Sequence, residues 1–198
     1  MNDVTTPLAS AKATLRKQVR AQMQSLSAAD RAAGSAQIVS RLLASELWSA
    51  SKSVLLYASL SDEPDVWPLA TSALAGGKTL ALPRFNQQTG YYAPCRIEHL
   101  DADVAPGQFG IREPAAHCAE LSADEIDLVL APGVAFDRAG WRLGRGRGFY
   151  DRLLASISGV KCGVAFDIQI VSDLPVVEHD QRVNFVLTPT EWIKAQSP

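Results

Sequence analysis

The sequence predicts a three-layer α/β fold, in which a mostly parallel sheet is flanked by helices. Short apolar runs bounded by polar or turn residues recur between residues 53 and 189, and such runs are typical of buried strands. Helical patterns separate several of these runs, and that alternation favours a parallel sheet covered on both faces. The first 45 residues have a helical pattern, so we expect N-terminal helices packed on the flank of the sheet.

The N-terminal helices are indicated by an apolar stripe and by a capping signal. Leu15, Val19 and Met23 are spaced four residues apart and share one helical face. Ser27, followed three residues later by Asp30, resembles a capping box that begins a second helix.

The other predicted elements follow in order along the chain. The first strand spans residues 53–58, and S-D-E-P (61–64) indicates a turn at which a helix begins, with Pro64 near its first position. Gly76-Gly77 ends that helix. The remaining predicted elements are strands at 78–83, 90–100 (antiparallel), 126–132, 160–166 and 184–189, and a helix at 149–157.

Two of the predicted strands end in proline and are followed by a loop, at Pro83-Arg84 and at Pro132-Gly133. Ligands in open α/β sheets bind beyond the carboxyl ends of the strands, so both loops are candidates for a site. We find no internal repeat and no linker, and we expect one domain over residues 1–198. Cys162, in mid-strand, is expected to be a small core residue.

Composition excludes several classes of protein. The 198 residues include 19 Lys+Arg and 21 Asp+Glu, which give a net charge of −2, whereas general nucleic-acid binders are strongly basic. The apolar runs fall short of the ~20 residues that span a bilayer, and the N-terminus lacks the pattern of a secretory signal. Three cysteines without a C-x-x-C spacing suit neither a disulfide framework nor a zinc site. We therefore expect a cytoplasmic protein that binds neither nucleic acid nor membrane.

The segment 132–152 has the composition of a phosphate-binding loop. Gly144, Gly146 and Gly148 alternate with Arg145 and Arg147, and a helical pattern follows. Alternate glycines let backbone N–H groups approach an anion, the helix N-terminus adds a positive dipole, and arginine donates bidentate hydrogen bonds to phosphate. A solvated surface loop is the alternative. The segment is neither a Walker A loop, because no G-K-[ST] follows, nor a Rossmann fingerprint, because the third glycine comes one residue too early.

Charged residues on two predicted helices each have two interpretations. Asp151, in the first turn after the glycines, is either a partner for the helix dipole or an oxygen ligand for Mg²⁺ beside bound phosphates. Lys12 and Arg16 lie four residues apart and share a helical face. Next to an apolar stripe, such cations either extend to the rim of the core or face a cleft.

The run from Pro132 to Arg152 resembles the signature of the 5-formyltetrahydrofolate cyclo-ligases, also called 5,10-methenyltetrahydrofolate synthetases. That pattern is an apolar strand, P-G-x-A-F-D, a short spacer, and R-L-G-x-G-x-G-[YF]-Y-D. Three further segments, K-A-T-L-R (12–16), S-D-E (61–63) and L-P-V-V-E-H-D (174–180), are similar to other parts of the family and come in its order. The central motif is long and specific, whereas the other three would be weak alone.

The resemblance implies an ATP-dependent ligase that converts 5-formyltetrahydrofolate, with or without a polyglutamate tail, to 5,10-methenyltetrahydrofolate, ADP and phosphate. It implies phosphorylation of the formyl oxygen and ring closure by the 10-nitrogen, and we expect a monomer.

The resemblance also assigns roles to residues. Lys12 and Arg145 would act in catalysis, and Asp151 and Asp180 would hold Mg²⁺. Glu63 would bind the folate together with Arg145, Gly146, Arg147, Gly148 and Phe149. The residues implied to contact ATP are Lys12, Arg16, Arg142, Leu143, Gly144, Arg145, Gly146, Arg147, Gly148, Phe149 and Tyr150.

The sequence departs from the family pattern at a few positions, and rival functions remain open. Phe149 stands where tyrosine is common, and Asn184 stands where aspartate is usual, which leaves a second C-terminal carboxylate without a counterpart. One rival is a sugar-phosphate isomerase or CoA-transferase in which Glu63 abstracts a proton, and it predicts no need for ATP. The other is a small nucleotide- or RNA-binding regulator, which the charge and the low aromatic content disfavour.

Overall fold

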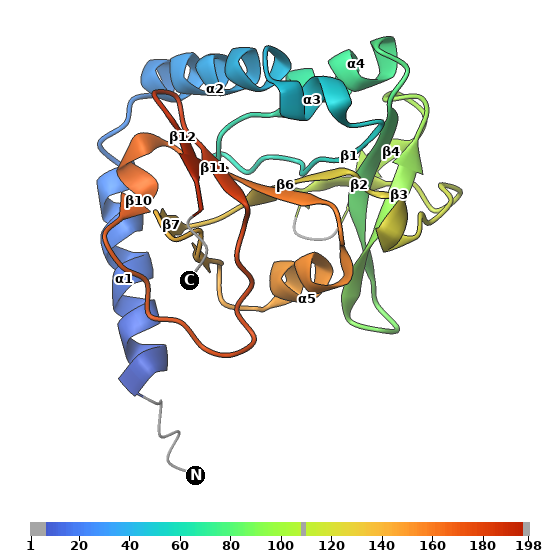
Figure 1. Cartoon of the computed structure of the whole chain (residues 1–198). Coiled ribbons are helices and arrows are strands. Elements are labelled where there is room, and N and C mark those ends of the chain that lie inside the picture. The colour runs from blue at the N-terminus through green and yellow to red at the C-terminus, as the bar shows by residue number, and fades with distance from the viewer. Residues whose placement is uncertain (1–6, 108–109, 196–198) are drawn as a thin grey trace.

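The structure is a computed structural model that describes residues 7–107 and 110–195. A seven-stranded sheet lies between helices (Figure 1). The α-helices are α1 (Pro7–Met23), α2 (Ala28–Leu43), α3 (Glu46–Ala50), α4 (Trp67–Ala75) and α5 (Phe149–Ser156). The strands of this sheet are β1 (Ser53–Leu55), β2 (Thr79–Asn86), β3 (Tyr91–Ile97), β6 (Leu128–Pro132), β9 (Val160–Val164), β11 (Phe185–Leu187) and β12 (Trp192–Lys194).

The strand order is β12-β11-β9-β6-β1-β2-β3, with β1 at the point where the order reverses. The pairs β1–β2, β1–β6, β6–β9 and β9–β11 are parallel, and only the edge strands β3 and β12 are antiparallel. The predicted mostly parallel sheet is therefore confirmed. Because the chain leaves β1 toward β2 and returns on its other side at β6, the carboxyl ends of β1 and β6 flank a crevice where such sheets bind ligands.

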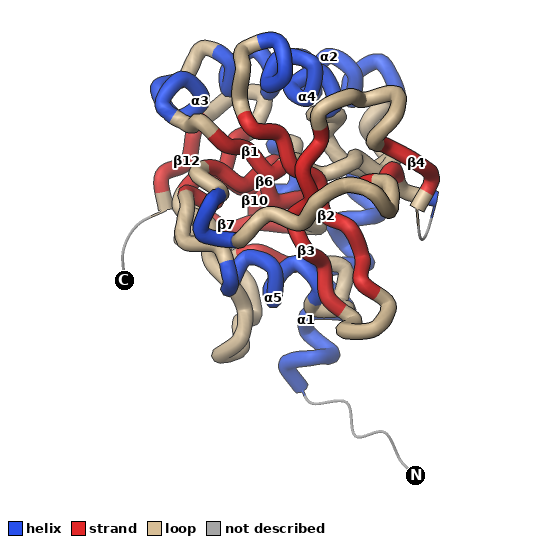
Figure 2. Tube along the Cα trace, turned by 90° about the vertical axis from the view of Figure 1, so that its right-hand side faces the viewer, coloured by secondary structure: helices blue, strands red, loops and turns tan. Residues whose placement is uncertain are grey.

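Alternate residues of the central strands fill two separate cores. Val54 and Leu56 pack in the core covered by α2, α3 and α4, whereas Leu55 packs with Leu153 and Leu154 of α5 in the other. Figure 2 shows α2, α3 and α4 on one side of the sheet and α5 on the opposite side. Each buried Val or Leu side chain contributes about 1.5–3 kcal/mol, and the two cores together produce the predicted three layers.

The helix α1 lies at the flank of the sheet, as predicted, and packs on a smaller one. That sheet contains β10 (Ile170–Val171), β7 (Ala135–Asp137) and β8 (Arg142–Leu143). Val19 and Met23 of α1 share a core with Leu143 and Phe166, and Figure 1 shows α1 beside β7 and β10. The second N-terminal helix, α2, lies across the face of the seven-stranded sheet. Because α1 packs beside β8, its cations Lys12 and Arg16 lie next to the loop that follows β8.

Two predictions near the site are wrong in detail. The helix predicted to begin at Pro64 begins at Trp67, where Pro68 lies in the first turn. The Pro83-Arg84 loop lies inside β2, which continues to Asn86 because it pairs with β3 as a hairpin. Pro83 stands opposite Pro94 in that pairing, and the hairpin turn ends at Gly90, whose φ of 72° favours glycine.

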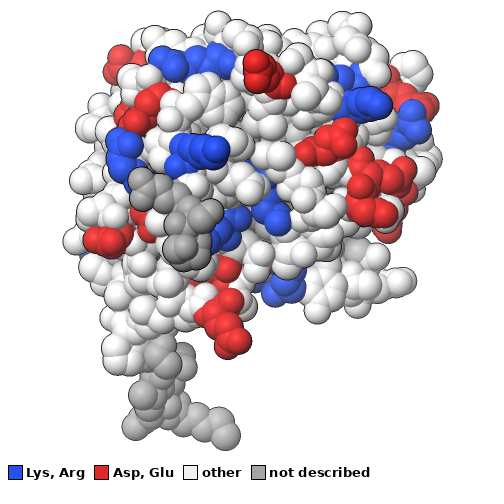
Figure 3. Space-filling view, in the orientation of Figure 1, with Lys and Arg blue, Asp and Glu red and all other residues white. Residues whose placement is uncertain are grey.

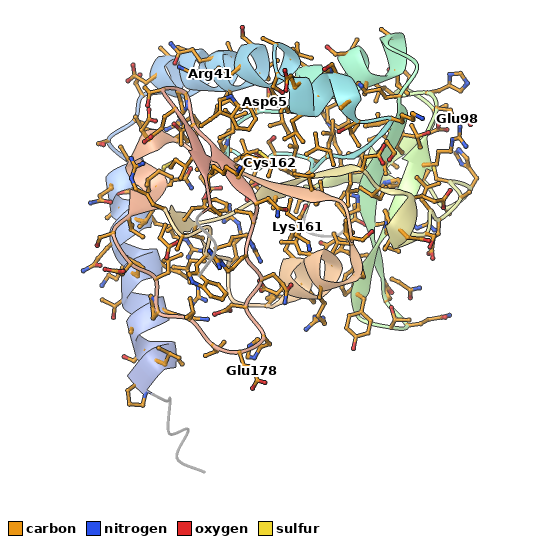
Figure 4. All side chains as sticks on the ribbon, viewed as in Figure 1. Arg41, Asp65, Glu98, Lys161, Cys162 and Glu178 are labelled. Carbon is orange, nitrogen blue, oxygen red and sulfur yellow. The ribbon has the colours of Figure 1, made fainter. Side chains whose placement is uncertain are left out.

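Several local predictions are confirmed. Ser27 and Asp30 form the capping box of α2, and Gly76 ends α4. Cys162, labelled in Figure 4, is fully buried within β9. The strands that the sequence analysis missed are short: β4 (Val104–Pro106), β5 (Arg112–Pro114), β7, β8, β10 and β12.

Candidate active site

A cavity of about 300 Å³ lies beyond the carboxyl ends of β1 and β6. Tyr57 and Ala58 follow β1 at its wall, and Pro132 and Gly133 mark the end of β6. The prediction that Pro132-Gly133 borders a site is therefore supported by the structure. The other lining residues are Leu60, Glu63, Pro83, Tyr92, Ile111, Arg112, Glu113, Arg142, Gly144, Arg145, Arg147, Gly148, Phe149, Tyr150 and Asp151.

The loop between β8 and α5 forms one wall of the cavity and depends on its glycines. Gly146 and Gly148 have φ values of 102° and 66°, in the left-handed region that other residues avoid. A Cβ at Gly144 would lie 3.0 Å from Nη1 of Arg142, so a side chain there would displace that arginine. Gly148 caps α5 without a side-chain hydrogen bond, and the first backbone N–H groups of a helix are natural donors to anions.

Arg142, at the base of the loop, is held by the protein itself. Its side chain is 3% exposed, Nη1 donates to the carbonyl of Pro132 at 3.1 Å, and Nη2 donates to Asp151 Oδ1 at 2.7 Å. Nε has no hydrogen-bond partner among the described residues. Arg142 thus connects the end of β6 to the first turn of α5, which fixes the base of the loop that it was predicted to help wrap around ATP.

Arg145, at the crest of the loop, contacts two carboxylates at the cavity wall. Its Nε and Nη2 lie 3.2 and 3.0 Å from Glu63 Oε1, and Nη2 lies 2.6 Å from Asp62 Oδ1. Burial lowers the pKa of Arg145, but the two carboxylates outweigh that effect and raise it. Two segments that the sequence analysis treated separately, S-D-E and the glycine loop, therefore meet at one ion-pair cluster.

Glu63 is a buried carboxylate at the wall of the cavity, with a side chain 8% exposed. Burial raises its pKa, and the N–H of Leu60 and the guanidinium of Arg145 oppose that shift. Leu60 N donates to Glu63 Oε2 at 3.0 Å. A buried acceptor pair of this kind can recognise a ligand edge that carries two N–H groups.

The N-terminal cations reach the same loop from α1. Arg16 Nε donates to the carbonyl of Gly144 at 2.8 Å, and Lys12 forms an ion pair with Asp180. Burial and then repulsion from Arg20 lower the pKa of Arg16, while Asp180 and Asp151 counter the shift. Both cations therefore contact charged or polar groups of other segments, but neither lines the cavity, and the two interpretations of this helical face stay open.

Asp151 and Asp180 both lie close enough to Arg16 to act on its charge. Each uses one carboxylate oxygen in the contacts above: Asp151 through Oδ1, and Asp180 through Oδ2, which also accepts from the N–H of Val177 at 2.7 Å. Asp151 Oδ2 and Asp180 Oδ1 have no hydrogen bond to a described residue. Oxygen ligands from one or two carboxylates, completed by phosphate, suit Mg²⁺, so the donor chemistry of these two side chains fits the ion that the resemblance implies.

An aromatic wall that was not predicted from the sequence is formed by the β2–β3 hairpin and the start of α5. Phe85, Tyr92 and Phe149 have ring centroids 5.1–5.7 Å apart, and Tyr92 lies 6.2 Å from Tyr150. Burial raises the pKa of Tyr92 and of Tyr150. Arg152 lies over the ring of Phe149 at 5.3 Å. A flat aromatic ligand could stack on such a wall. No sequence pattern indicated it, because its rings meet only where the β2–β3 hairpin packs against α5.

The predicted site residues are brought to one region, although they do not all line the cavity. Leu143 is buried against α1 in the core with Val19 and Met23 and is absent from the lining. Asn184, where the family usually has aspartate, accepts from the N–H of Lys161 at 2.8 Å and braces β11. The loop that contains Asp180 lies below the sheet in Figure 4, where Glu178 labels it.

The distribution of charge on the surface and the character of the helices bear on possible binding to nucleic acid or membrane. On the face seen in Figure 3, basic and acidic side chains are interspersed, with no continuous basic area. Among the described helices, none combines the length and apolar character that a membrane crossing requires.

Comparison with known proteins identifies similar sequences over most of the chain. The sequence profile of the 5-formyltetrahydrofolate cyclo-ligase family matches residues 8–189. The 5-formyltetrahydrofolate cyclo-ligase of Mus musculus is 30% identical over 195 residues, covering 90% of this chain and 93% of the mouse protein. The protein of the same name from Escherichia coli (strain K12) is 33% identical over 146 residues, covering 70% and 80% of the two chains.

Solved structures agree with that similarity. The NMR structure of 5,10-methenyltetrahydrofolate synthetase from Aquifex aeolicus has a TM-score of 0.85 to this chain, with 33% identity and 94% of each chain covered. The synthetase from Mycoplasma pneumoniae has a TM-score of 0.72 at 20% identity, covering 90% of this chain and 98% of its own. The second match supports the fold alone.

Proposed function

The chain belongs to the 5-formyltetrahydrofolate cyclo-ligase family, and from this premise we propose that it converts 5-formyltetrahydrofolate to 5,10-methenyltetrahydrofolate at the expense of ATP. The observation that carries the proposal is that Glu63 and the glycine loop line one cavity, while Arg16 of α1 contacts the same loop at Gly144. A carboxylate that can accept from the N–H groups of a pterin therefore lies next to a loop that can donate hydrogen bonds to phosphate.

The chemistry divides into two displacements. The formyl oxygen attacks the γ-phosphorus of ATP, so that an O–P bond forms, the bond to the β-phosphate oxygen breaks, and ADP leaves. The 10-nitrogen then attacks the activated formyl carbon and releases its proton to solvent. The new C–N bond closes the ring as the C–O bond breaks, and phosphate departs with the formyl oxygen.

The residues contribute position and charge, and no covalent nucleophile is needed. Glu63 would accept hydrogen bonds from the pterin and orient the formyl group. Arg145, at the crest of the loop, and Lys12, from α1, would neutralise the phosphate charge that moves between the substrates. Holding reactants in line and stabilising their charge supplies most of the catalysis in phosphoryl transfer.

Other parts of the loop would hold the nucleotide. Gly144 to Gly148 would present backbone N–H groups to the phosphates, with Arg16 and Arg147 beside them. Mg²⁺ would be held by Asp151 and Asp180, and it would offset part of the negative charge of the triphosphate. Phe149 and Tyr150 would supply aromatic surface to the substrates.

Several finer features complete the proposal. The chain would act as a cytoplasmic monomer, without nucleic acid or membrane, on substrates with or without a polyglutamate tail. Residues 1–198 would form one functional domain.

The test is to follow the absorbance of methenyl-folate formed from 5-formyltetrahydrofolate with and without Mg-ATP. We expect turnover only with ATP and a divalent cation, and one ADP and one phosphate for each ring closed. Stoichiometric product without nucleotide would refute the proposal. An isomerase that uses Glu63 as a base would instead act on a sugar phosphate without ATP.

A further inference from the structure

The turn before α4 places a second carboxylate, Asp62, on the guanidinium that Glu63 contacts, and the proposed reaction does not use it. Nη2 of Arg145 lies 2.6 Å from Asp62 Oδ1 and 3.0 Å from Glu63 Oε1. The Asp62 side chain is 44% exposed, whereas that of Glu63 is 8% exposed. Glu63 therefore holds Arg145 from within the cavity wall, and Asp62 holds it from the rim.

The other edge of the Arg145 guanidinium has no hydrogen bond to the residues that the structure describes. Nη1 lies on that edge, and the hydrogen bonds of Arg145 to these residues all run through Nε and Nη2. Arg145 lines the cavity together with Gly144 and Gly148 of the loop. The planar guanidinium can keep one edge on a carboxylate while its remaining N–H groups donate to phosphate.

Substrate binding separates the roles of the two carboxylates. A pterin that takes the oxygens of Glu63 competes with Arg145 for them, because a carboxylate oxygen offers few acceptor positions. Asp62 lies at the rim and has Arg145 as its hydrogen-bond partner among the described residues. It can therefore keep its contact when Glu63 is engaged.

Resting on the proposed function, we propose that Asp62 is a positioning residue for the phosphoryl-transfer step. It keeps Arg145 oriented over the junction between the folate cavity and the glycine loop while Glu63 binds substrate. The Nη1 edge then faces the phosphoryl group in transfer. Without Asp62, Arg145 would keep its charge but lose the contact that fixes its orientation.

A purely electrostatic role for Asp62 predicts the opposite outcome. If Asp62 only neutralised Arg145 before substrates bind, its removal would leave a more available cation beside the phosphates. Nucleotide affinity would rise, and kcat would stay the same or increase. The direction of the change in kcat therefore distinguishes a positioning role of Asp62 from a purely electrostatic one.

The test compares steady-state kinetics of Asp62→Asn, Asp62→Glu and a control, Glu191→Gln. Glu191 pairs with Arg138 at 2.7 Å in an exposed ion pair that does not line the cavity, so it tests the same carboxylate-to-amide change elsewhere. We expect kcat of Asp62→Asn to fall on the order of tenfold, with KM for 5-formyltetrahydrofolate changed by less than about twofold. Asp62→Glu should return to within about threefold of the parent kcat. The control should match the parent, and melting temperatures should agree throughout.

Three outcomes would overturn the inference. One is a kcat for Asp62→Asn equal to or above that of the parent. Another is an Asp62→Glu variant no faster than Asp62→Asn, and the third is a loss of kcat that a lowered melting temperature accounts for. Failure of the proposed function is distinguishable, because the parent protein itself would then form no methenyl-folate with Mg-ATP.

Discussion

Two arginines three positions apart, at the base and at the crest of one loop, have different surroundings. The base arginine, Arg142, is 3% exposed and joins the carbonyl of Pro132 to Asp151. The crest arginine, Arg145, is 37% exposed and lies over the cavity against Glu63 and Asp62. The base connects parts of the fold, and the crest is placed to meet substrates.

The difference follows from the backbone that carries each residue. Arg142 belongs to β8, whose pairing with β7 directs it beneath the loop, and a Cβ at Gly144 would displace its guanidinium. Arg145 lies between two glycines, beyond the last strand residue. Loop arginines of one motif can therefore serve either the fold or the ligand, and burial distinguishes them.

Arg142→Ala should have the largest effect, which is on stability. The substitution leaves the carboxylate of Asp151 and the carbonyl of Pro132 without their partner. Breaking a buried ion pair by removing one member costs about 3–5 kcal/mol. Chemical denaturation would measure the loss of unfolding free energy, with Arg138→Ala, at an exposed pair, as the control. Equal losses in the two variants would mean that Arg142 stabilises the fold no more than an exposed arginine does.

Arg145→Ala should lower activity and cost less stability than Arg142→Ala, because the Arg145 side chain is 37% exposed whereas that of Arg142 is 3% exposed. A charge-assisted contact to substrate is worth about 1.5–3 kcal/mol, which corresponds to roughly 10- to 150-fold in kcat/KM. Arg152→Ala is the matched control, because Arg152 lies over the Tyr91 and Phe149 rings and such exposed contacts are worth about 0.5–1 kcal/mol. If both variants lost the same activity, the crest of the loop would not be the phosphate site.

Glu63→Gln should weaken folate binding and leave ATP binding nearly intact. An amide keeps one acceptor oxygen and turns a donor toward the N–H edge of the pterin. A buried mismatch of this kind costs about 1–3 kcal/mol, or roughly 5- to 150-fold in affinity. Calorimetric titration of each ligand separates the two sites. Normal folate affinity with only a lower melting temperature would reduce Glu63 to a structural carboxylate.

The pH dependence of folate affinity should show the smallest effect. Burial raises the pKa of Glu63, and the protonated carboxyl no longer accepts at both oxygens. Affinity should therefore be full above the folded pKa and fall as pH drops through it, at a higher pH than for an ordinary glutamate. The stability contribution has the opposite sign: it is present below the unfolded pKa and lost as pH rises through the folded one. A titration series in which Glu63→Gln keeps the same acid limb would contradict this assignment.

Much of the fold could be predicted from the sequence, because its core elements follow local rules. The apolar runs at β1, β6, β9 and β11 identified the parallel strands, and Ser27 with Asp30 identified the start of α2. The elements that were missed depend on pairing between distant residues. β7 and β8 are too short to show a period, and they exist because Asp137 accepts from the N–H of Trp141 across a turn at Gly140.

The site was predictable as a set of residues but not as a set of contacts. The motif indicated which residues to examine, including Glu63 and Arg145, yet it gave no sign that they form an ion pair across 82 positions of the chain. Arg142 and Arg145 have different roles because one is buried and the other is not, and the alternation of glycine and arginine in the sequence does not indicate which is which. The aromatic wall was missed because Phe85 and Tyr92 reach Phe149 only after the hairpin forms.

The most direct test of this division between base and crest is thermal unfolding of Arg142→Lys and Arg145→Lys with and without saturating ligands. Ligands that bind only the folded state raise its stability, so the rise in melting temperature reports on binding. We expect Arg142→Lys to melt lower than the parent but to keep most of the rise produced by Mg-ATP and 5-formyltetrahydrofolate. Arg145→Lys should melt like the parent and lose most of that rise. Two variants with the same starting temperature and the same ligand response would contradict the account.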